Sequence, residues 1–259
     1  MRDGRPATLP PLPGRTLSEL GRTFDEMRDA LAGRQHAERY TQALAHEVKA
    51  PLRAIRGAAE LLQEEMPADQ RTRFLANIGL ESARIQKIIE RLLELTSIEA
   101  RKALRKSGRM KASEVVAEAA DGVRSSYVAR NVTLNVTASV DGGFEGERFL
   151  LRQALINLLQ NALDFSPPGG EVRFAAVMTS GRVVSTVRDG GPGVPEYALP
   201  RVFERFFSLG RPGTGEKSTG IGLALVREIA YLHGGDAALA NLPEGGAAAT
   251  FWLPLERAK

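Results

Sequence analysis

Apolar residues recur at helical spacing through the first hundred positions of the chain. The earliest stretch alternates between spacings of three and four, as a coiled-coil seam does, at Leu17, Leu20, Phe24, Met27 and Leu31. Two longer apolar stripes follow at residues 44–62 and 74–98, and the sequence MPAD at 66–69 separates them. This pattern predicts two long amphipathic helices joined by a short turn. Because one hairpin buries little surface by itself, the stripes predict a partner, and a dimeric four-helix bundle is the simplest arrangement.

The second half of the chain mixes helical with alternating segments. Helical periodicity predicts helices at residues 112–123, 149–163 and 219–232. Alternation of apolar and polar residues predicts strands at residues 132–140, 171–177, 182–188 and 247–255. Together these elements predict one mixed α+β domain with its own core, and we expect it to begin near Ser107 and Gly108.

Composition agrees with a folded protein of about two domains, at roughly 150 residues each for a chain of 259. Hydrophobic residues make up 43% and charged residues 25%, which excludes a disordered chain. There is no cysteine, which excludes disulfides, zinc–thiolate sites and cysteine nucleophiles. No stretch approaches the roughly 18 consecutive apolar residues of a membrane span, so we expect this polypeptide to be soluble.

Positive charge is concentrated at the front of the chain. Lys and Arg number 35 against 31 Asp and Glu, and the first 110 residues hold 20 of the basic and 15 of the acidic side chains. The densest basic run lies at residues 101–111 and contains no aromatic residue. A run of this kind is more often a solvated connector than a nucleic-acid site, so no nucleic-acid partner is expected.

A first candidate for chemistry is the sequence ALAHEVKAPL at 43–52, which places His46 and Glu47 on a predicted helix. A neutral imidazole is a competent nucleophile near neutral pH. An adjacent carboxylate holds one ring nitrogen protonated and leaves the other lone pair available for attack. On this pair alone, a surface histidine of an amphipathic helix remains the better interpretation.

A second candidate is the pair Asn157 and Asn161, which share one face of an otherwise apolar predicted helix. Buried amides are costly unless they find partners. An amide oxygen is a hard ligand suited to Mg²⁺ that carries nucleotide phosphates. The alternative role, capping of a helix end, is weakened because both residues lie in the middle of the helix.

The glycines give a third candidate. Asp189 ends a predicted strand, and Gly191 and Gly193 allow a tight turn in which the backbone approaches a ligand closely. Further on, Gly220 and Gly222 open a predicted helix, and such a helix start is an anion site suited to phosphates. The spacing matches neither the dinucleotide fingerprint nor a Walker A loop, so it is weak evidence by itself.

Taken in order, these segments resemble the motifs of sensor histidine kinases of bacterial two-component systems. They are the H box HEVKAPL, the N box NLLQNA, the G1 box DGGPG, the F box FERFF and the G2 box TGIGLALV. Residues 14–33 also resemble the second half of a HAMP signal relay. Within the family, the segments IRGAAELL and YALPRVFERFFSL are similar to the CreC-type kinases.

The resemblance implies a role for each matching residue. His46 would be the phosphoacceptor and Glu47 its orienting acid or base, while Asn161 would hold Mg²⁺ and Asn157 would contact the phosphates. Asp189 would accept a hydrogen bond from the adenine amino group of ATP. The remaining nucleotide-binding residues would be the G1 glycines and the end of the ATP lid, which spans 208–219: Gly191, Gly193, Lys217, Thr219, Gly220 and Gly222.

Two positions depart from the family pattern. Ala50 stands where a Thr or Asn often positions water for dephosphorylation of the partner regulator. Asp164 stands where a Lys or Arg usually follows the second Asn of the N box, which casts doubt on a secondary phosphate contact.

The resemblance also implies an organisation and partners. A HAMP part and connector would occupy residues 1–35, the dimerisation and phosphotransfer hairpin 36–106, and an α/β-sandwich ATP-binding domain of the GHKL or Bergerat type 107–259. The chain would form a homodimer and pass its phosphoryl group to the receiver domain of a response regulator. It would be the cytoplasmic portion of a protein held in the bacterial inner membrane by preceding segments.

Two alternative functions stay open on the sequence. One is a GHKL-fold ATPase without a phosphoacceptor, and the other is a degenerate kinase that acts only as a dimeric adaptor. The presence of His46, Asn161 and Asp189 argues against the adaptor.

Overall fold

The computed structural model describes residues 44, 45, 47–101, 103–139, 143–213, 215 and 218–255. The HAMP-like segment, His46 and Lys217 lie outside the described residues. The chain divides into two compact units, residues 1–82 and 83–259.

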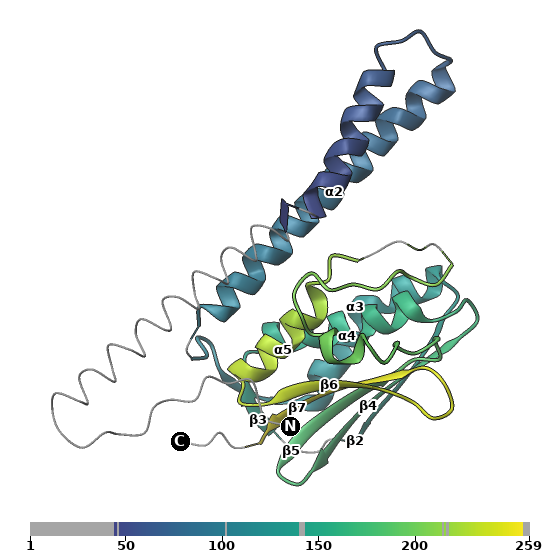
Figure 1. The fold of residues 1–259 in the computed structure, drawn as a ribbon. Helices are drawn as coiled ribbons and strands as arrows, with labels where there is room; N and C mark the ends of the chain where they lie inside the picture. Colours follow the sequence, from purple (N-terminus) through teal and green to yellow (C-terminus); the bar gives the residue numbers. More distant parts are fainter. Residues whose placement is uncertain are drawn as a thin grey trace, which may run out of the picture. The chain divides into compact units, whose positions relative to one another are not determined.

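The first unit is a helical hairpin. Residues 47–61 are helical, the chain reverses over 62–67, and α2 (Ala68–Glu99) follows, which confirms both predicted helices (Figure 1). Phe74 and Ile78 of α2 are half-buried, as their stripe predicts, but Leu75 and Leu80 are 56% and 71% exposed. Among the described helices, none combines the length and the apolar character that crossing a membrane requires.

The second unit continues from α2 into an alternation of strands and helices. Its elements are, in order, β1 (Gly108–Lys111), α3 (Ala112–Ala129), β2 (Thr133–Ser139), β3 (Gly143–Gly146), α4 (Arg148–Phe165), β4 (Glu171–Thr179), β5 (Arg182–Arg188), a short 3-10 helix η1 (Leu199–Arg201), α5 (Gly222–Leu232), β6 (Asp236–Asn241) and β7 (Ala247–Pro254). Strands and helices share one core, so the predicted fold class, a helical region followed by a mixed α+β domain, is confirmed.

The main sheet has five strands in the order β2-β4-β5-β7-β6, and β1 pairs with β3 in a separate ribbon. Among the described strands of this sheet only β2 and β4 run parallel, and the chain between them passes through β3 and α4, since parallel neighbours need a crossover. Alternate residues of β4 point to the helical side, where Val172, Phe174 and Ala176 are buried. Helices α3, α4 and α5 cover that one face of the sheet (Figure 1).

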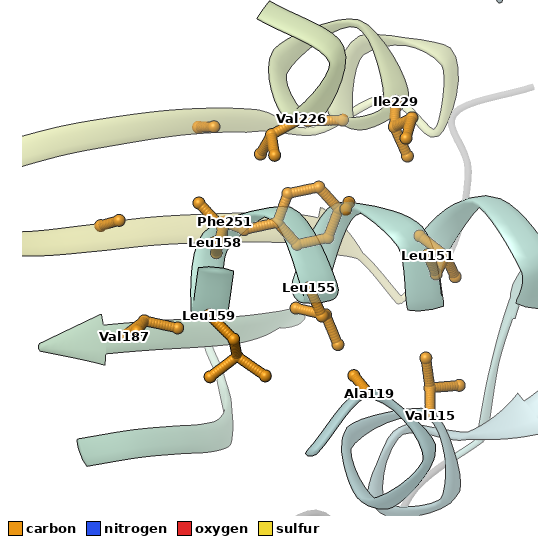
Figure 2. Packing of buried hydrophobic residues seen from close by; sticks show 14 of the residues in the cluster. Val115, Ala119, Leu151, Leu155, Leu158, Leu159, Val187, Val226, Ile229 and Phe251 are labelled. Carbon is orange, nitrogen blue, oxygen red and sulfur yellow. The ribbon is translucent and has the colours of Figure 1, made fainter. Parts of the chain in front are cut away.

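Helix α4 lies at the centre of the core. Its residues Leu151, Leu155, Leu158 and Leu159 pack among side chains of α3, α5 and the sheet, including Phe251 of β7 (Figure 2). Two residues of α2, Leu95 and Ile98, belong to the same buried cluster. The C-terminal half of α2 is therefore part of the second unit.

The elements differ from the prediction in length and number. Helix α3 continues six residues beyond its predicted end, and α5 begins at Gly222 rather than at residue 219. Strands β1, β3 and β6 were not predicted. The sequence of β6, DAALAN, lacks the β-branched and aromatic residues that indicate strands, and β6 forms by pairing with β7 at the edge of the sheet.

Candidate functional site

Asp189 follows the last residue of β5 and is half-buried. Its Oδ1 accepts hydrogen bonds from the backbone N–H groups of Gly191 at 2.9 Å and Ala247 at 3.3 Å. Burial raises the pKa of the Asp189 carboxyl, and these two N–H groups oppose the rise. Within the described residues Oδ2 makes no hydrogen bond, so this oxygen is available to accept one from a ligand.

The loop after Asp189 is fixed by a residue that the sequence did not indicate. Asn241, at the end of β6, accepts from Val194 N–H and donates to the Val194 carbonyl, both at 2.7 Å. Gly193 lies beside it with φ +76°, and a Cβ atom at Gly193 would stand 2.9 Å from Asn241 Oδ1. Only glycine fits such a conformation and approach without strain. No local pattern marks Asn241, since its partner is 47 residues away.

Asn157 and Asn161 lie one turn apart on α4, as predicted, and both are half-buried. The Asn157 amide donates to the Gln153 carbonyl at 3.0 Å, while Asn161 makes no side-chain hydrogen bond within the described residues. Phe165 continues the same face one turn further on.

Two glycines lie close to the two ends of the α4 face that runs from Asn157 to Phe165. A Cβ atom at Gly222 would stand 3.3 Å from Asn157 Oδ1, and one at Gly191 would stand 2.6 Å from the Phe165 carbonyl oxygen. Eight residues of helix separate the two contacts, which is about 12 Å at 1.5 Å per residue. Asn161 lies midway, so the face connects the Asp189 loop with the start of α5.

The start of α5 is shaped by Gly220, whose φ is +64°. The carbonyl of Gly220 accepts from Phe206 N–H at 2.9 Å, and a Cβ atom at Gly220 would stand 2.5 Å from the Phe206 carbonyl carbon. Among the described residues, no side chain caps the start of α5. The first N–H groups of a helix have no intrahelical partner, so those of α5 can bind a ligand. The positive end of the helix dipole favours an anion there.

The segment between the F box and α5 is tied to α4 through Asp164. Asp164 accepts from Arg211 at 2.6 Å and from Arg130 at 3.2 Å. Ser208 and Ser218 are joined by two hydrogen bonds across the same segment. The acidic residue at 164, noted as a departure from the family pattern, thus binds a cation of the predicted lid.

The predicted site residues divide into three groups. Asn157, Asn161, Asp189 and the four glycines line the region just described, and Thr219 joins them by accepting a hydrogen bond from Arg91 at 3.4 Å. Glu47 is half-buried on the helical segment of the first unit. His46 and Lys217 lie outside the described residues.

These donors and acceptors fit a nucleotide. An open carboxylate oxygen at one end suits an adenine amino group, the uncapped helix start at the other end suits phosphates, and an amide oxygen lies between them. The described residues contain no group of three or more His, Cys, Asp or Glu side chains that could hold a metal ion. An amide oxygen is a hard ligand of the kind that suits Mg²⁺ together with the phosphate oxygens of a nucleotide.

Comparison with known proteins identifies the class. Residues 146–257 match the family of histidine kinase-, DNA gyrase B- and HSP90-like ATPases, and residues 37–101 match the His Kinase A (phospho-acceptor) domain. The chain belongs to the sensor histidine kinase family, as its motif order predicted. Among curated relatives it is similar to the sensor protein CreC of Escherichia coli K12, with 40% identity over 261 residues covering 97% of this chain and 52% of that protein. The chain spans about half the length of the curated relatives it matches.

Solved structures agree with this assignment. A mycobacterial sensor histidine kinase, MprB, matches with a TM-score of 0.50 and 28% identity over 59% of this chain and 100% of that one. The histidine kinase ThkA, solved in complex with the response regulator protein TrrA, matches 90% of this chain and 66% of that one with a TM-score of 0.73. At 21% identity, the similarity to ThkA shows a shared fold alone.

Proposed function

We propose that this chain is an ATP-dependent protein-histidine kinase that phosphorylates His46 and passes the phosphoryl group to an aspartate of a response regulator. The observation that carries the proposal is the half-buried carboxylate of Asp189, open at one oxygen and aligned along α4 with Asn161 and the start of α5. In this proposal, the arrangement binds adenine at one end and phosphates at the other.

In this proposal Asp189 Oδ2 accepts a hydrogen bond from the adenine amino group, and Gly191 and Gly193 bring the loop backbone against the base. Asn161 supplies an amide oxygen to Mg²⁺, and Asn157 contacts the phosphates. Lys217 and Thr219 complete the phosphate side from the lid, while Gly220 and Gly222 form its hinge. Bound Mg²⁺ neutralises phosphate charge, and the protein contributes mainly by positioning the reactants.

The transfer step uses His46 and Glu47. A ring nitrogen of His46 attacks the γ-phosphorus, the bond from that phosphorus to the β–γ bridging oxygen breaks, and ADP leaves with the electron pair. Glu47 orients the ring through its other nitrogen and takes up the proton that the ring must lose. A second transfer then moves the phosphoryl group to the regulator's aspartate.

A homodimer is the proposed assembly. Leu52, Leu75 and Leu80 of the first unit are each more than half exposed, and such side chains would be covered in a four-helix bundle. We also propose the predicted organisation of residues 1–35, 36–106 and 107–259, with HAMP-like residues that connect the kinase to a sensor held in the inner membrane.

The decisive experiment is incubation with Mg²⁺ and γ-labelled ATP. The native chain should acquire acid-labile, base-stable label, His46→Gln should acquire none, and the control His36→Gln should label normally. Full labelling of His46→Gln would contradict the proposal. An ATPase without a phosphoacceptor would release labelled phosphate without labelling itself, and an adaptor would do neither.

A further inference from the structure

One arginine of α2 reaches the phosphate side of the proposed nucleotide site. Arg91 Nη1 donates to Thr219 Oγ1 at 3.4 Å, and the same nitrogen is 3.8 Å from the point where a Cβ atom would stand at Gly222. That point is also 3.3 Å from Asn157 Oδ1. The guanidinium therefore lies where the middle of α4 and the start of α5 meet, and all these residues belong to the second unit.

The partner that Arg91 has in the structure does not account for its burial. Its hydrogen bond goes to a neutral hydroxyl and is long for a bond of this kind. Within the described residues no carboxylate forms an ion pair with it. Burial lowers the pKa of Arg91. The charges of Glu94 and Asp164 oppose this shift, and that of Arg211 adds to it. A half-buried guanidinium without a paired anion is costly, and an anionic ligand beside it would remove that cost.

The surrounding charges favour the same kind of ligand. Burial lowers the pKa of Lys87, and the charges of Arg91 and Arg211 lower it further. The charge of Asp164 raises it, but by less than Arg91 lowers it. Asp164 itself already binds Arg211 and Arg130. Glu94 is the other carboxylate that acts on Arg91, so the cations Lys87, Arg91 and Arg211 still outnumber these two carboxylates.

We propose that Arg91 binds the triphosphate of the nucleotide, so that α2, the second helix of the phosphoacceptor hairpin, supplies part of the phosphate site. This proposal rests on the proposed function. A guanidinium presents paired N–H donors whose geometry matches phosphate oxygens. A hydroxyl partner makes poor use of these paired donors. The nucleotide then contacts three elements of the second unit, the C-terminal half of α2, α4 and α5.

The test compares nucleotides that share adenosine but differ in phosphate number. Calorimetry of the full chain with Mg²⁺ would measure the affinities of ATP, ADP and AMP for the native protein, Arg91→Gln and Arg91→Lys. Arg124→Gln is the matched control, because Arg124 lies on α3 in an exposed pair with Asp121. Fluorescence of Trp252, the only tryptophan, reports whether each variant is folded.

We expect Arg91→Gln to weaken ATP binding by about 10- to 100-fold, the loss of a charge-assisted contact. The affinity of Arg91→Gln for AMP should be unchanged, and its loss of affinity for ADP should lie between those for AMP and ATP. Arg91→Lys should lose less affinity for ATP than Arg91→Gln, because lysine keeps the charge. Equal losses for AMP and ATP, or an unchanged ATP affinity in folded Arg91→Gln, would overturn the proposal. If the native chain bound none of the three nucleotides, the proposed function itself would be wrong.

Discussion

In the proposed function, nucleotide recognition depends most directly on the polar side chains of Asp189 and Asn161. Asp189→Asn replaces the acceptor oxygen of a half-buried carboxylate, and Asn161→Ala removes an amide oxygen that has no protein partner among the described residues. We expect each change to weaken Mg-ATP binding by about 10-fold or more, because a ligand donor or ion loses its partner in a desolvated site. Calorimetry checks this, with Asn77→Ala on the exposed face of α2 as control. Unchanged affinity in both variants would exclude these roles.

Ala50 permits a prediction that separates two activities. It is exposed on the helical segment one turn after His46 and carries only a methyl group. Aligning water for attack on an aspartyl phosphate needs a hydrogen-bonding group. The transfer from ATP to His46 that we propose does not use such a group at position 50. We therefore expect a competent kinase with slow phosphatase activity, and faster dephosphorylation in Ala50→Thr. Loss of phosphate from a purified phosphorylated regulator measures this, and rapid loss with native protein, unchanged in the variant, would refute it.

Glu147 links stability to pH. Burial opposes ionisation, but the backbone N–H groups of Arg105 and Lys106 and the guanidinium of Arg101, at 3.0 Å, hold the pKa of Glu147 below its usual value of 4.5. A carboxyl with a depressed pKa in the fold stabilises above pH 4.5 and loses that contribution as the pH falls through the folded pKa.

We therefore expect the difference in unfolding free energy between the native chain and Glu147→Gln to shrink as the pH is lowered below 4.5. Denaturant unfolding followed by Trp252 fluorescence measures it. Glu145→Gln, an exposed neighbour on β3, is the control and should show no comparable pH-dependent difference. A difference that is constant from pH 7 to pH 3 would rule out the role of Glu147.

At the scale of elements, α3 and α4 are joined by a buried polar contact. The Tyr127 hydroxyl donates to the Leu159 carbonyl at 2.7 Å, and burial raises the pKa of Tyr127. Tyr127→Phe should lower the free energy of unfolding by about 1 kcal/mol, the usual net value of one hydrogen bond. Urea unfolding measures it, with the exposed Tyr197→Phe expected to stay within about 0.5 kcal/mol of native. Equal stabilities of the two variants would show that the contact contributes nothing.

Elements with a strong hydrophobic periodicity could be predicted from the sequence. Elements that form through contacts with neighbouring strands or loops could not. Helix α4 carries Leu151, Leu155, Leu158 and Leu159 at helical spacing, because one face packs on the sheet and its flanking helices. Strand β6 has no such pattern, since at the edge of the sheet its residues are specified by pairing with β7 rather than by burial. The start of α5 was placed three residues early because glycine permits several conformations, and only the contact with Phe206 selects one.

For the whole molecule, the exposed leucines of the hairpin lead to a prediction about assembly. Light scattering at micromolar concentration should report twice the mass of one chain. Replacing Leu75 and Leu80 by Glu should shift the protein toward a monomer, because charged side chains would enter the proposed bundle core. Gln70→Glu, on an exposed position near the start of α2, is the control. A native chain that stays monomeric at high micromolar concentration would contradict the dimer.

The sequence by itself determined the helical hairpin, the helices α3, α4 and α5, the strands β2, β4, β5 and β7, and the order of the five motifs. It also marked the residues on α4 and after β5 that we propose to bind the nucleotide. These features can be predicted from local sequence, because hydrophobic periodicity indicates which face of an element is buried and glycine indicates where the backbone turns. Only the tertiary structure decided which side chains hold those residues in place. Asn241 on Val194, Asp164 on Arg211 and Arg91 on Thr219 are pairs separated by 47, 47 and 128 positions. Contacts between residues so far apart leave no pattern in either local segment, because each arises when the completed fold brings two surfaces together.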